Sequence, residues 1–519
     1  MANQTDGSIS PPRPGIDSAL YPTIAVGVSL IVVLLLNPVG YIGGGQDDAR
    51  YLSAARCWVE HGMCLPTNHW EGRWPIFAPI AAIIALAGES RLTVQIWPLV
   101  SSVAAALLVA EIGRRLFGAL AATFIAVLFV SMPTFALQLM TPSVEAIELA
   151  FILGSVLCIV NWRSSGKSIW AFAAGLFLGL AVQVRETSLA AAAVIFLALY
   201  VSGKRPRLSD LAWAGAGFFL PLAIEFIAYQ WVTNDFLYRR HLSLAHTKIP
   251  SSQLDPAVDT RGSPILNPAI IGGWQREPGI ELHWLVDGPL NILFNARAGF
   301  ALLLTPLLLF VGRRYLQPKD RRAAWLLLGF AAIYIALINY FFAMDPKPRV
   351  MLIALAAGSV ALGLVCGRLW EAGRKLLVSA CVGSVLVGSA LLVAGFFRPV
   401  WAEQQAKQWA AQYPGAIEID IMTRRYVTLA PELRNLPNYS ADLPYAMAVS
   451  ESTCPDWVDR TELHDELTIV DGKRLSMFPR FGRSGRSWVC LFKYNGPVSS
   501  ERMAEGARQA WLKAERFRR

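Results

Sequence analysis

Apolar stretches of membrane-spanning length recur along the chain from residue 20 to residue 397, separated by short polar connections. A helix needs about 20 predominantly apolar residues to cross the hydrocarbon core of a bilayer. The pattern therefore predicts a polytopic α-helical membrane protein with about 11 spans. The predicted spans are residues 20–40, 93–110, 119–140, 145–162, 169–183, 187–201, 210–231, 298–312, 323–343, 349–367 and 376–397.

Two apolar stretches cannot be assigned by length alone. As one helix, residues 169–201 would be about 50 Å long, which exceeds a hydrocarbon core of about 30 Å. We expect instead a hairpin of two short spans with Arg185 and Glu186 at its outer tip. Residues 74–88 contain two prolines near their start and would reverse the charge pattern of the loops if they crossed the membrane. They are therefore predicted to form an interfacial helix on the outer face.

Basic residues are concentrated in alternate connections between the predicted spans. The positive-inside rule places such short basic loops in the cytoplasm. We therefore predict an inner (plasma) membrane protein with a cytoplasmic tail at residues 1–19 and a transmembrane part at residues 20–397. The basic connections are residues 111–118, 161–168, 202–210, 312–322 and 367–375, and the segments predicted to face the periplasm are residues 41–92, 232–297 and 398–519.

The composition agrees with this topology. Hydrophobic residues make up 54% of the chain and charged residues only 16%, whereas soluble proteins average about 25% charged residues. The formal net charge of +10 lies largely in the short loops. We interpret it as a topology signal, so no nucleic-acid partner is expected. No small-residue cleavage site follows the first apolar run, which is therefore expected to be a retained span.

The last segment, residues 398–519, differs from the rest because helical and strand-like patterns alternate in it. A helix is predicted at residues 401–413, and a second, amphipathic helix closes the chain. Short strand candidates lie between them, at residues 416–421, 445–450, 466–471 and 487–494. We predict a small soluble α/β domain outside the membrane, which serves either acceptor binding or capping.

Two adjacent aspartates, Asp47 and Asp48, follow the first predicted span. Apolar residues recur after them at helical spacing, so residues 47–60 are predicted to form an amphipathic helix along the membrane surface. Acidic side chains stabilise a helix N-terminus, so the pair could serve as a cap. Alternatively the pair is catalytic, and one of its carboxylates serves as a general base that accepts a proton.

Four cysteines occur as two pairs in the segments predicted to face outward, which suits an oxidising compartment. Cys57 and Cys64 could form a disulfide, remain thiols, or join nearby histidines at a metal ion. Their spacing fits no standard zinc pattern, so no metal ligand is assigned. Cys454 and Cys490 form a second candidate disulfide.

Residues 47–62, "DDARYLSAARCWVEHG", resemble the first outer loop of lipid-carrier-dependent glycosyltransferases of the GT-C class. The relatives in question are the protein O-mannosyltransferases and aminoarabinose transferases, in which an Asp-Glu-x-x-Tyr pattern heads a surface helix. Asp47 matches the Asp of this pattern, Asp48 stands at its Glu, and Tyr51 matches its Tyr. Arg73 stands where a Lys is common in the following Lys-Pro-Pro-Leu stretch, and Trp74 replaces the first proline.

The resemblance extends over roughly residues 20–400 and excludes the C-terminal segment. "RRLFG" at residues 114–118 resembles a recurring turn of the family, and "TPSVEAIE" at 141–148 is similar to an outer loop with a late acidic residue, here Glu145. "GLAVQVRETSLA" at 179–190 resembles a Gly-rich span that ends in a basic residue. "DPKPRVMLI" at 345–353 is similar to the Pro-Arg segment that begins a late span.

The resemblance implies transfer of a sugar from a polyprenyl-phosphate donor to a glycan, lipid or protein acceptor, with inversion at the anomeric carbon. The implied base is Asp47 or Asp48, Asp47 being favoured by its family position. A leaving phosphate needs positive charge nearby, for which the candidates are Arg185, Arg349, Lys347 and Arg73. Tyr51, Glu145 and Glu186 are candidate substrate contacts. Membrane lipids are expected partners, no cofactor is expected, and a requirement for a divalent metal ion is left open.

Two other classes of protein fit parts of the pattern. A transporter or flippase of lipid-linked sugars would carry polar residues near the bilayer midplane and often internal repeats. Here the charges gather at the outer ends of the predicted spans, and no repeat is visible. The second alternative is an envelope assembly factor in which the C-terminal segment is the functional part.

Overall fold

The computed structural model describes most of the chain. The described residues are 17–37, 47–201, 206–246, 292–298, 300–341, 348–395, 399–419, 433, 436–437, 439, 443–450, 453–461, 463, 465–475 and 488–496. Lys347, the closing helix, most of the 232–297 loop and most of the N-terminal tail lie outside them.

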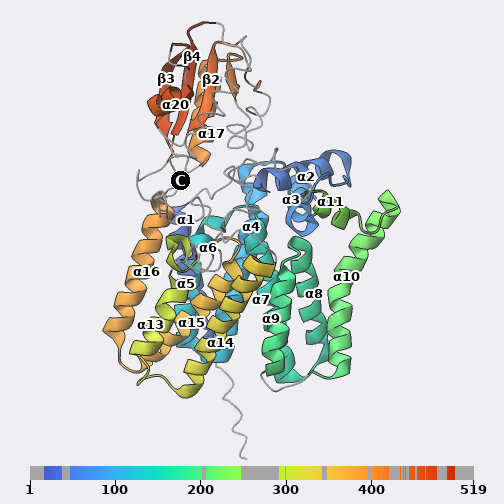
Figure 1. Cartoon of the computed structure of the whole chain (residues 1–519), viewed down its shortest axis with the longest axis vertical. Helices are drawn as coiled ribbons and strands as arrows, with labels where there is room; N and C mark the ends of the chain where they lie inside the picture. The colour runs from blue at the N-terminus through green and yellow to red at the C-terminus, as the bar shows by residue number, and fades with distance from the viewer. Residues whose placement is uncertain are drawn as a thin grey trace, which may run out of the picture.

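A bundle of helices forms the larger part of the molecule (Figure 1). Its helices begin and end close to the predicted spans because apolar stretches are bounded by polar turns and helix-breaking residues. They are α1 (Asp17–Leu36), α4 (Arg91–Phe117), α5 (Ala119–Val130), α6 (Pro133–Gln138), α7 (Val144–Ser165), α8 (Ser168–Val184), α9 (Ser188–Val201), α10 (Leu208–Thr233), η1 (Ala296–Ala298), α13 (Ala301–Val311), α14 (Pro318–Ala336), η2 (Leu337–Phe341), α15 (Leu352–Glu371) and α16 (Lys375–Gly395).

Seven helices among the described residues are long and apolar enough to cross a membrane. The chain is therefore a multi-pass membrane protein. The predicted count of about 11 spans also includes the shorter α5, α8, α9 and α13 and stays a prediction. The predicted hairpin of residues 169–201 appears as α8 and α9, which meet at a turn containing Arg185 and Glu186.

Two predicted spans are not single α-helices. The stretch 119–140 divides into α5 and α6, because Pro133 cannot continue the helix that ends before it. The stretch 323–343 begins earlier, at Pro318, and passes from α14 into the π-helix η2. An insertion of this kind re-aims the side chains beyond it and is frequent at functional sites.

Glycines set the closest helix contact in the bundle, between α8 and α10. A Cβ atom added at Gly175 would lie 1.9 Å from the Ala214 carbonyl oxygen, and one at Gly217 would lie 2.1 Å from the Phe172 oxygen. Only glycine permits this backbone approach. The two helices thus form one rigid pair on one side of the bundle.

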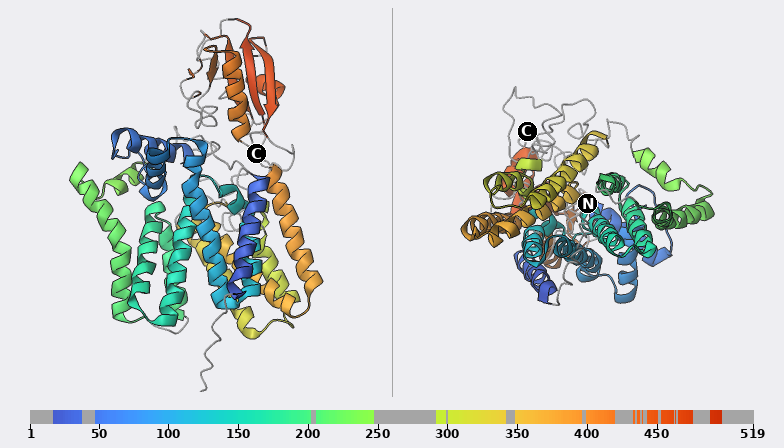
Figure 2. Two further views of the ribbon diagram at one scale, coloured as in Figure 1. Left: turned by 180° about the vertical axis from the view of Figure 1, so that it is seen from behind. Right: turned by 90° about the horizontal axis from the view of Figure 1, so that it is seen from below.

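Three helices lie across one end of the bundle: α2 (Asp47–His61), α3 (Trp74–Ala87) and α11 (Tyr238–His246) (Figures 1 and 2). The helices predicted from the patterns at residues 47–60 and 74–88 correspond to α2 and α3. They pack through Tyr51, Ala55, Ile76 and Ile80, all buried in one hydrophobic cluster. The connections from α7 to α8 and from α13 to α14 lie at the opposite end of the bundle (Figure 1).

The C-terminal part contains a four-stranded sheet of order β1-β2-β4-β3. The β1–β2 pair is parallel, and the other two pairs are antiparallel. All four strand patterns noted in the sequence form strands, whereas the short helix α20 was not predicted. The elements are α17 (Pro399–Gln412), β1 (Ile417–Ile419), β2 (Tyr445–Ser450), α20 (Cys454–Thr461), β3 (Leu467–Arg474) and β4 (Trp488–Tyr494).

The C-terminal part contacts the bundle at the same end as α2 and α3 (Figure 1). Arg91, at the start of α4, forms an ion pair with Glu403 on α17. Leu137 on α6 belongs to the same buried cluster as Ala402, Ala406 and Trp409 of α17. One polar and one apolar contact therefore fix the sheet and its helix above the bundle.

Candidate active site

The aspartate pair heads α2, as the sequence predicts, but its two members differ. Asp48 is only 4% exposed, and one of its oxygens accepts a hydrogen bond of 3.0 Å from the Ala49 backbone N–H. Asp47 is more accessible, with its side chain 25% exposed. Both lie in the first helical turn, where negative charge is stabilised by the helix dipole.

Asp47 begins a chain of ion pairs that joins four separate segments. An Asp47 carboxylate oxygen lies 3.5 Å from a terminal nitrogen of Arg349, just before α15. The Arg349 Nε lies 3.9 Å from Glu145 at the start of α7, and the same Glu145 oxygen lies 3.1 Å from Arg185. Arg185 in turn lies 3.3 Å from Glu148. The fold thus brings together four of the residues singled out in the sequence.

The two arginines of this chain have different surroundings. The Arg185 side chain is 8% exposed and lies between two carboxylates, those of Glu145 and Glu148. The Arg349 side chain is 40% exposed. A guanidinium already neutralised by two buried carboxylates is poorly placed to receive another anion, whereas Arg349 retains access. Arg185 therefore positions Glu145, and Arg349 is the accessible cation.

The inner end of the chain is a buried polar cluster. The Ser188 hydroxyl donates a hydrogen bond of 2.6 Å to Glu148. Tyr334 on α14 is fully buried and interacts electrostatically with Glu148 and Arg185, and its hydroxyl has no hydrogen-bond partner among the described residues. Sequence reasoning missed Glu148, Ser188 and Tyr334. Glu148 could have been found, because an ionisable residue inside an apolar stretch is itself a signal of function.

Tyr51 and Arg73 link α2 to the turn before α3. The Arg73 Nη1 donates a hydrogen bond of 2.7 Å to the Tyr51 hydroxyl. Tyr51 is fully buried, and this burial raises its pKa to about 12, opposed by the positive charge of Arg73. The phenol therefore stays neutral in the physiological range and holds Arg73 at the edge of the site.

Tyr51→Phe is expected to destabilise the fold by about 1 kcal/mol, because Arg73 loses its hydrogen-bond acceptor. Since folding raises the pKa of Tyr51 from 10.0 to about 12, its contribution to stability is full below about pH 10 and is lost as the pH rises towards 12. Thermal unfolding of wild type and variant between pH 8 and 11 would measure both effects. If the wild type loses no more stability than the variant across this interval, Tyr51 does not titrate as described.

Glu186 and Arg239 form a second ion-pair cluster beside the first. Arg239 on α11 lies 3.2 Å from both Glu186 and Glu225, and it donates a hydrogen bond of 2.8 Å to the Gln183 carbonyl oxygen. The Glu186 side chain is 50% exposed. The cluster joins α8, α10 and α11, and the sequence indicated only Glu186 as a member of the site.

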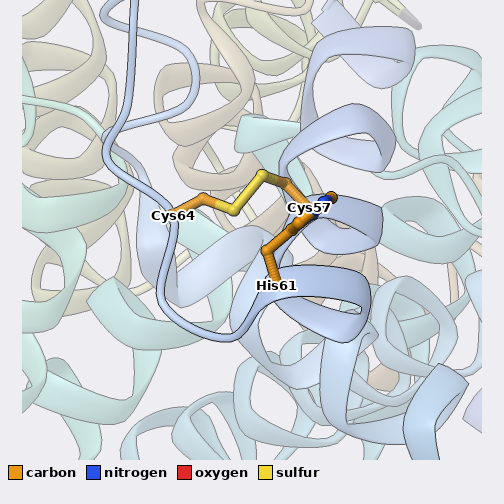
Figure 3. A group of neighbouring side chains, drawn as sticks. All are labelled: Cys57, His61 and Cys64. Atoms are coloured by element: carbon orange, nitrogen blue, oxygen red, sulfur yellow. A yellow bond between two sulfur atoms is a disulfide. The ribbon is translucent and has the colours of Figure 1, made fainter.

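Cys57 and Cys64 are joined by a disulfide at the C-terminal end of α2 (Figure 3). With His61 they are the one group of three candidate metal ligands among the described residues. Metal ions bind cysteine as thiolate, so the disulfide leaves only His61 available as a ligand. The second pair, Cys454 and Cys490, is also joined and connects α20 to β4.

Replacing Cys57 and Cys64 together by Ser is expected to lower the free energy of unfolding by about 2.5 kcal/mol, because the short loop between them is no longer closed in the unfolded chain. Because a reductant also opens Cys454–Cys490, the double variant and the wild type should have the same melting temperature only when both are reduced. Addition of Zn²⁺ should leave both unchanged, and a Zn²⁺-dependent rise in the melting temperature of the reduced wild type would indicate a metal site instead.

The comparisons with known proteins agree with the resemblance noted in the sequence. Residues 75–229 match the model of a family described as dolichyl-phosphate-mannose-protein mannosyltransferase. The match confirms the predicted resemblance to lipid-carrier-dependent glycosyltransferases, and the predicted enzyme class is the class of this family. Glu145, Arg185 and Glu186 lie inside the matched residues, whereas Asp47 and Arg349 lie outside. No curated protein matches the chain.

Three solved structures resemble the chain over most of its length. ArnT from Cupriavidus metallidurans in the apo state is 14% identical with a TM-score of 0.38, covering 95% of this chain and 99% of that one. The same protein bound to undecaprenyl phosphate is 14% identical with a TM-score of 0.39, and the match covers 91% of this chain and 98% of that one. The Archaeoglobus fulgidus oligosaccharyltransferase in the apo form is 12% identical with a TM-score of 0.47, and the match covers 87% of this chain and 71% of that one. Identity at this level gives no correspondence between individual residues.

Proposed function

We propose that the protein transfers a sugar from a polyprenyl-phosphate donor to a glycan, lipid or protein acceptor at the outer face of the inner membrane. The observation that carries this proposal is the contact between Asp47 and Arg349 at the head of α2. It pairs a partly exposed carboxylate with an accessible guanidinium, which are the two groups that such a transfer requires. No resident cofactor is assigned.

In the proposed reaction Asp47 acts as the general base and Asp48 as its buried neighbour. Asp47 takes the proton of the acceptor hydroxyl as the acceptor oxygen forms its bond to the anomeric carbon. The bond from that carbon to the phosphate oxygen breaks, and polyprenyl phosphate leaves with the electron pair. A single displacement of this kind inverts the anomeric configuration.

Arg349 is the proposed ligand of the departing phosphate, because its guanidinium is 40% exposed and lies beside the base. Positive charge placed where negative charge develops lowers the barrier to leaving-group departure. Glu145 holds both Arg349 and Arg185, so Arg185 acts through Glu145. Lys347 and Arg73 are further proposed phosphate contacts. Tyr51, Glu145 and Glu186 are proposed to shape the substrate site.

The proposed orientation places the N-terminus in the cytoplasm and the 398–519 segment in the periplasm. The five basic connections support this orientation, because short loops rich in Lys and Arg stay in the cytoplasm. Nucleotide sugars are used in the cytoplasm, so a base on the outer face needs a sugar already attached to a lipid carrier. Protease added to intact spheroplasts should remove the C-terminal segment, and its protection would overturn this orientation.

The function is tested with purified full-length protein and polyprenyl phosphate carrying a radiolabelled sugar. Release of unlabelled polyprenyl phosphate, with label moved to a cell-envelope acceptor fraction, is the expected result. The alternative, a flippase, predicts movement of labelled donor between leaflets of proteoliposomes without cleavage of the sugar–phosphate bond, and that outcome would contradict the proposal. The same assay with EDTA decides whether a divalent ion is required.

A further inference from the structure

An apolar cavity of about 250 Å³ lies among α7, α8, α9 and α10. Its walls include Ile159, Leu178, Ile195 and Phe218, one from each helix, and the cavity is open on one side. Among the described residues, Ser155 and Asp210 are its only polar or charged lining residues apart from the indole of Trp162. The lining therefore suits a hydrocarbon chain.

Most of the cavity lies away from the candidate active site, and only Ala192 on α9, one helical turn after Ser188, approaches it. Its lining from α8 runs from Ala171 to Leu178, whereas Arg185 follows the end of α8. Along a helix these positions lie about 10–20 Å from Arg185. The cavity thus lies toward the end of the bundle opposite α2 and α3, where the basic connections are found.

The rim of the cavity at that end is positively charged. Lys167 and Arg207 are exposed and immediately precede α8 and α10, and Arg163 lies in the last turn of α7. Pro206, next to Arg207, lines the cavity directly. Asp210 is the one acidic residue in the described part of the lining. It is buried, and its carboxylate accepts hydrogen bonds from the Ser168 hydroxyl and the Arg207 backbone N–H.

We propose that this cavity and its rim bind an anionic phospholipid of the cytoplasmic leaflet. One acyl chain occupies the cavity, and the phosphate lies against Lys167 and Arg207. Basic residues beside a gap between transmembrane helices attract anionic head groups, and Trp162 provides an aromatic side chain at the interface between chain and head group. The proposal does not depend on the reaction at Asp47.

The polyprenyl tail of the donor is a less suitable occupant. Its phosphate would sit at the Asp47 end, so the charged rim at the opposite end would have no anion to bind. A helix of a partner protein is also excluded by size, because α8 and α10 are held in backbone contact by Gly175 and Gly217. A phospholipid satisfies both the apolar lining and the charged rim.

The test uses full-length protein in neutral detergent and native mass spectrometry with phosphatidylglycerol or phosphatidylcholine. Wild type is expected to bind phosphatidylglycerol about tenfold more tightly, and Lys167→Gln with Arg207→Gln should remove this preference. The control is Arg313→Gln with Arg314→Gln, which makes the same change of charge in the exposed turn after α13, away from the cavity. Equal binding of the two lipids by wild type, or equal loss in the control, would overturn the proposal.

A second variant tests the cavity itself. Ala192→Trp on α9 should fill part of the cavity and lower the affinity for phosphatidylglycerol with little change in the melting temperature in lipid-free detergent. Displacement of bound phosphatidylglycerol by an equal concentration of polyprenyl phosphate would assign the cavity to the donor tail and overturn the proposal. Sugar transfer measured on the same variants separates this result from failure of the proposed function.

Discussion

Asp47→Asn is expected to lower sugar transfer by about 10²–10⁴-fold, the range of a general base. The amide keeps the size of the carboxylate and its place in the first turn of α2, but it cannot accept the proton of the acceptor hydroxyl. Binding of the lipid donor should change little, so the loss should appear in kcat. The measurement is the initial rate of transfer from a labelled polyprenyl-phosphate sugar, with folding checked by the melting temperature.

Asp48→Asn is the matched control for this prediction. Asp48 is buried and bonded to the backbone of its own helix, so the substitution should act mainly on stability. If Asp48→Asn removes transfer while Asp47→Asn retains it, the two roles are exchanged. If both variants and the double variant retain full transfer, the base lies elsewhere.

Arg349→Gln is expected to lower kcat/KM by about 10²–10³-fold, because the departing phosphate loses its charged partner. Arg349→Lys should restore part of the activity, since it keeps the charge and loses the planar pair of donors. The loss of kcat/KM in Arg349→Gln should also depend on the leaving group. A donor whose phosphate is a better leaving group should give a smaller difference in kcat/KM between this variant and wild type.

Arg50→Gln is the control for Arg349→Gln. Arg50 is an exposed arginine in the same turn of α2 as the aspartates. Its replacement by Gln removes one positive charge, as Arg349→Gln does. Its transfer rate should stay within about twofold of wild type if the effect of Arg349 is specific, as expected for an exposed charge at high dielectric. A loss at Arg50 as large as that at Arg349 would show a general electrostatic effect.

The helices could be predicted closely because each apolar stretch is bounded by polar or helix-breaking residues. The pattern of residues 169–201 indicated both α8 and α9 and the turn between them. The transition into the π-helix η2 could not be predicted, because no sequence pattern distinguishes one inserted residue in a continuous apolar stretch. The division of α5 from α6 could have been expected, since Pro133 was visible in the sequence.

The candidate site could be predicted in its residue types but not in its contacts. Asp47, Glu145 and Arg349 lie far apart in the sequence, and only the packing of α2, α7 and α15 decides that Glu145 lies between two arginines. From the sequence alone, Arg185 and Arg349 are equal candidates for binding the leaving phosphate. Burial separates them. Arg185 is 8% exposed and lies between two buried carboxylates, one of them Glu148, which was unnoticed inside an apolar stretch, whereas Arg349 is 40% exposed.

The contact of Leu137 with the C-terminal cluster has a consequence for chimeric proteins. Leu137 lies on α6, which Pro133 separates from α5, and it packs among residues of α17 together with the Arg91–Glu403 ion pair. A graft that exchanges only residues 399–496 for those of a relative would leave half of this interface mismatched. If Arg91 and α6 are transferred together with the graft, the interface should be preserved. The acceptor preference of such chimeras could then be compared without loss of fold.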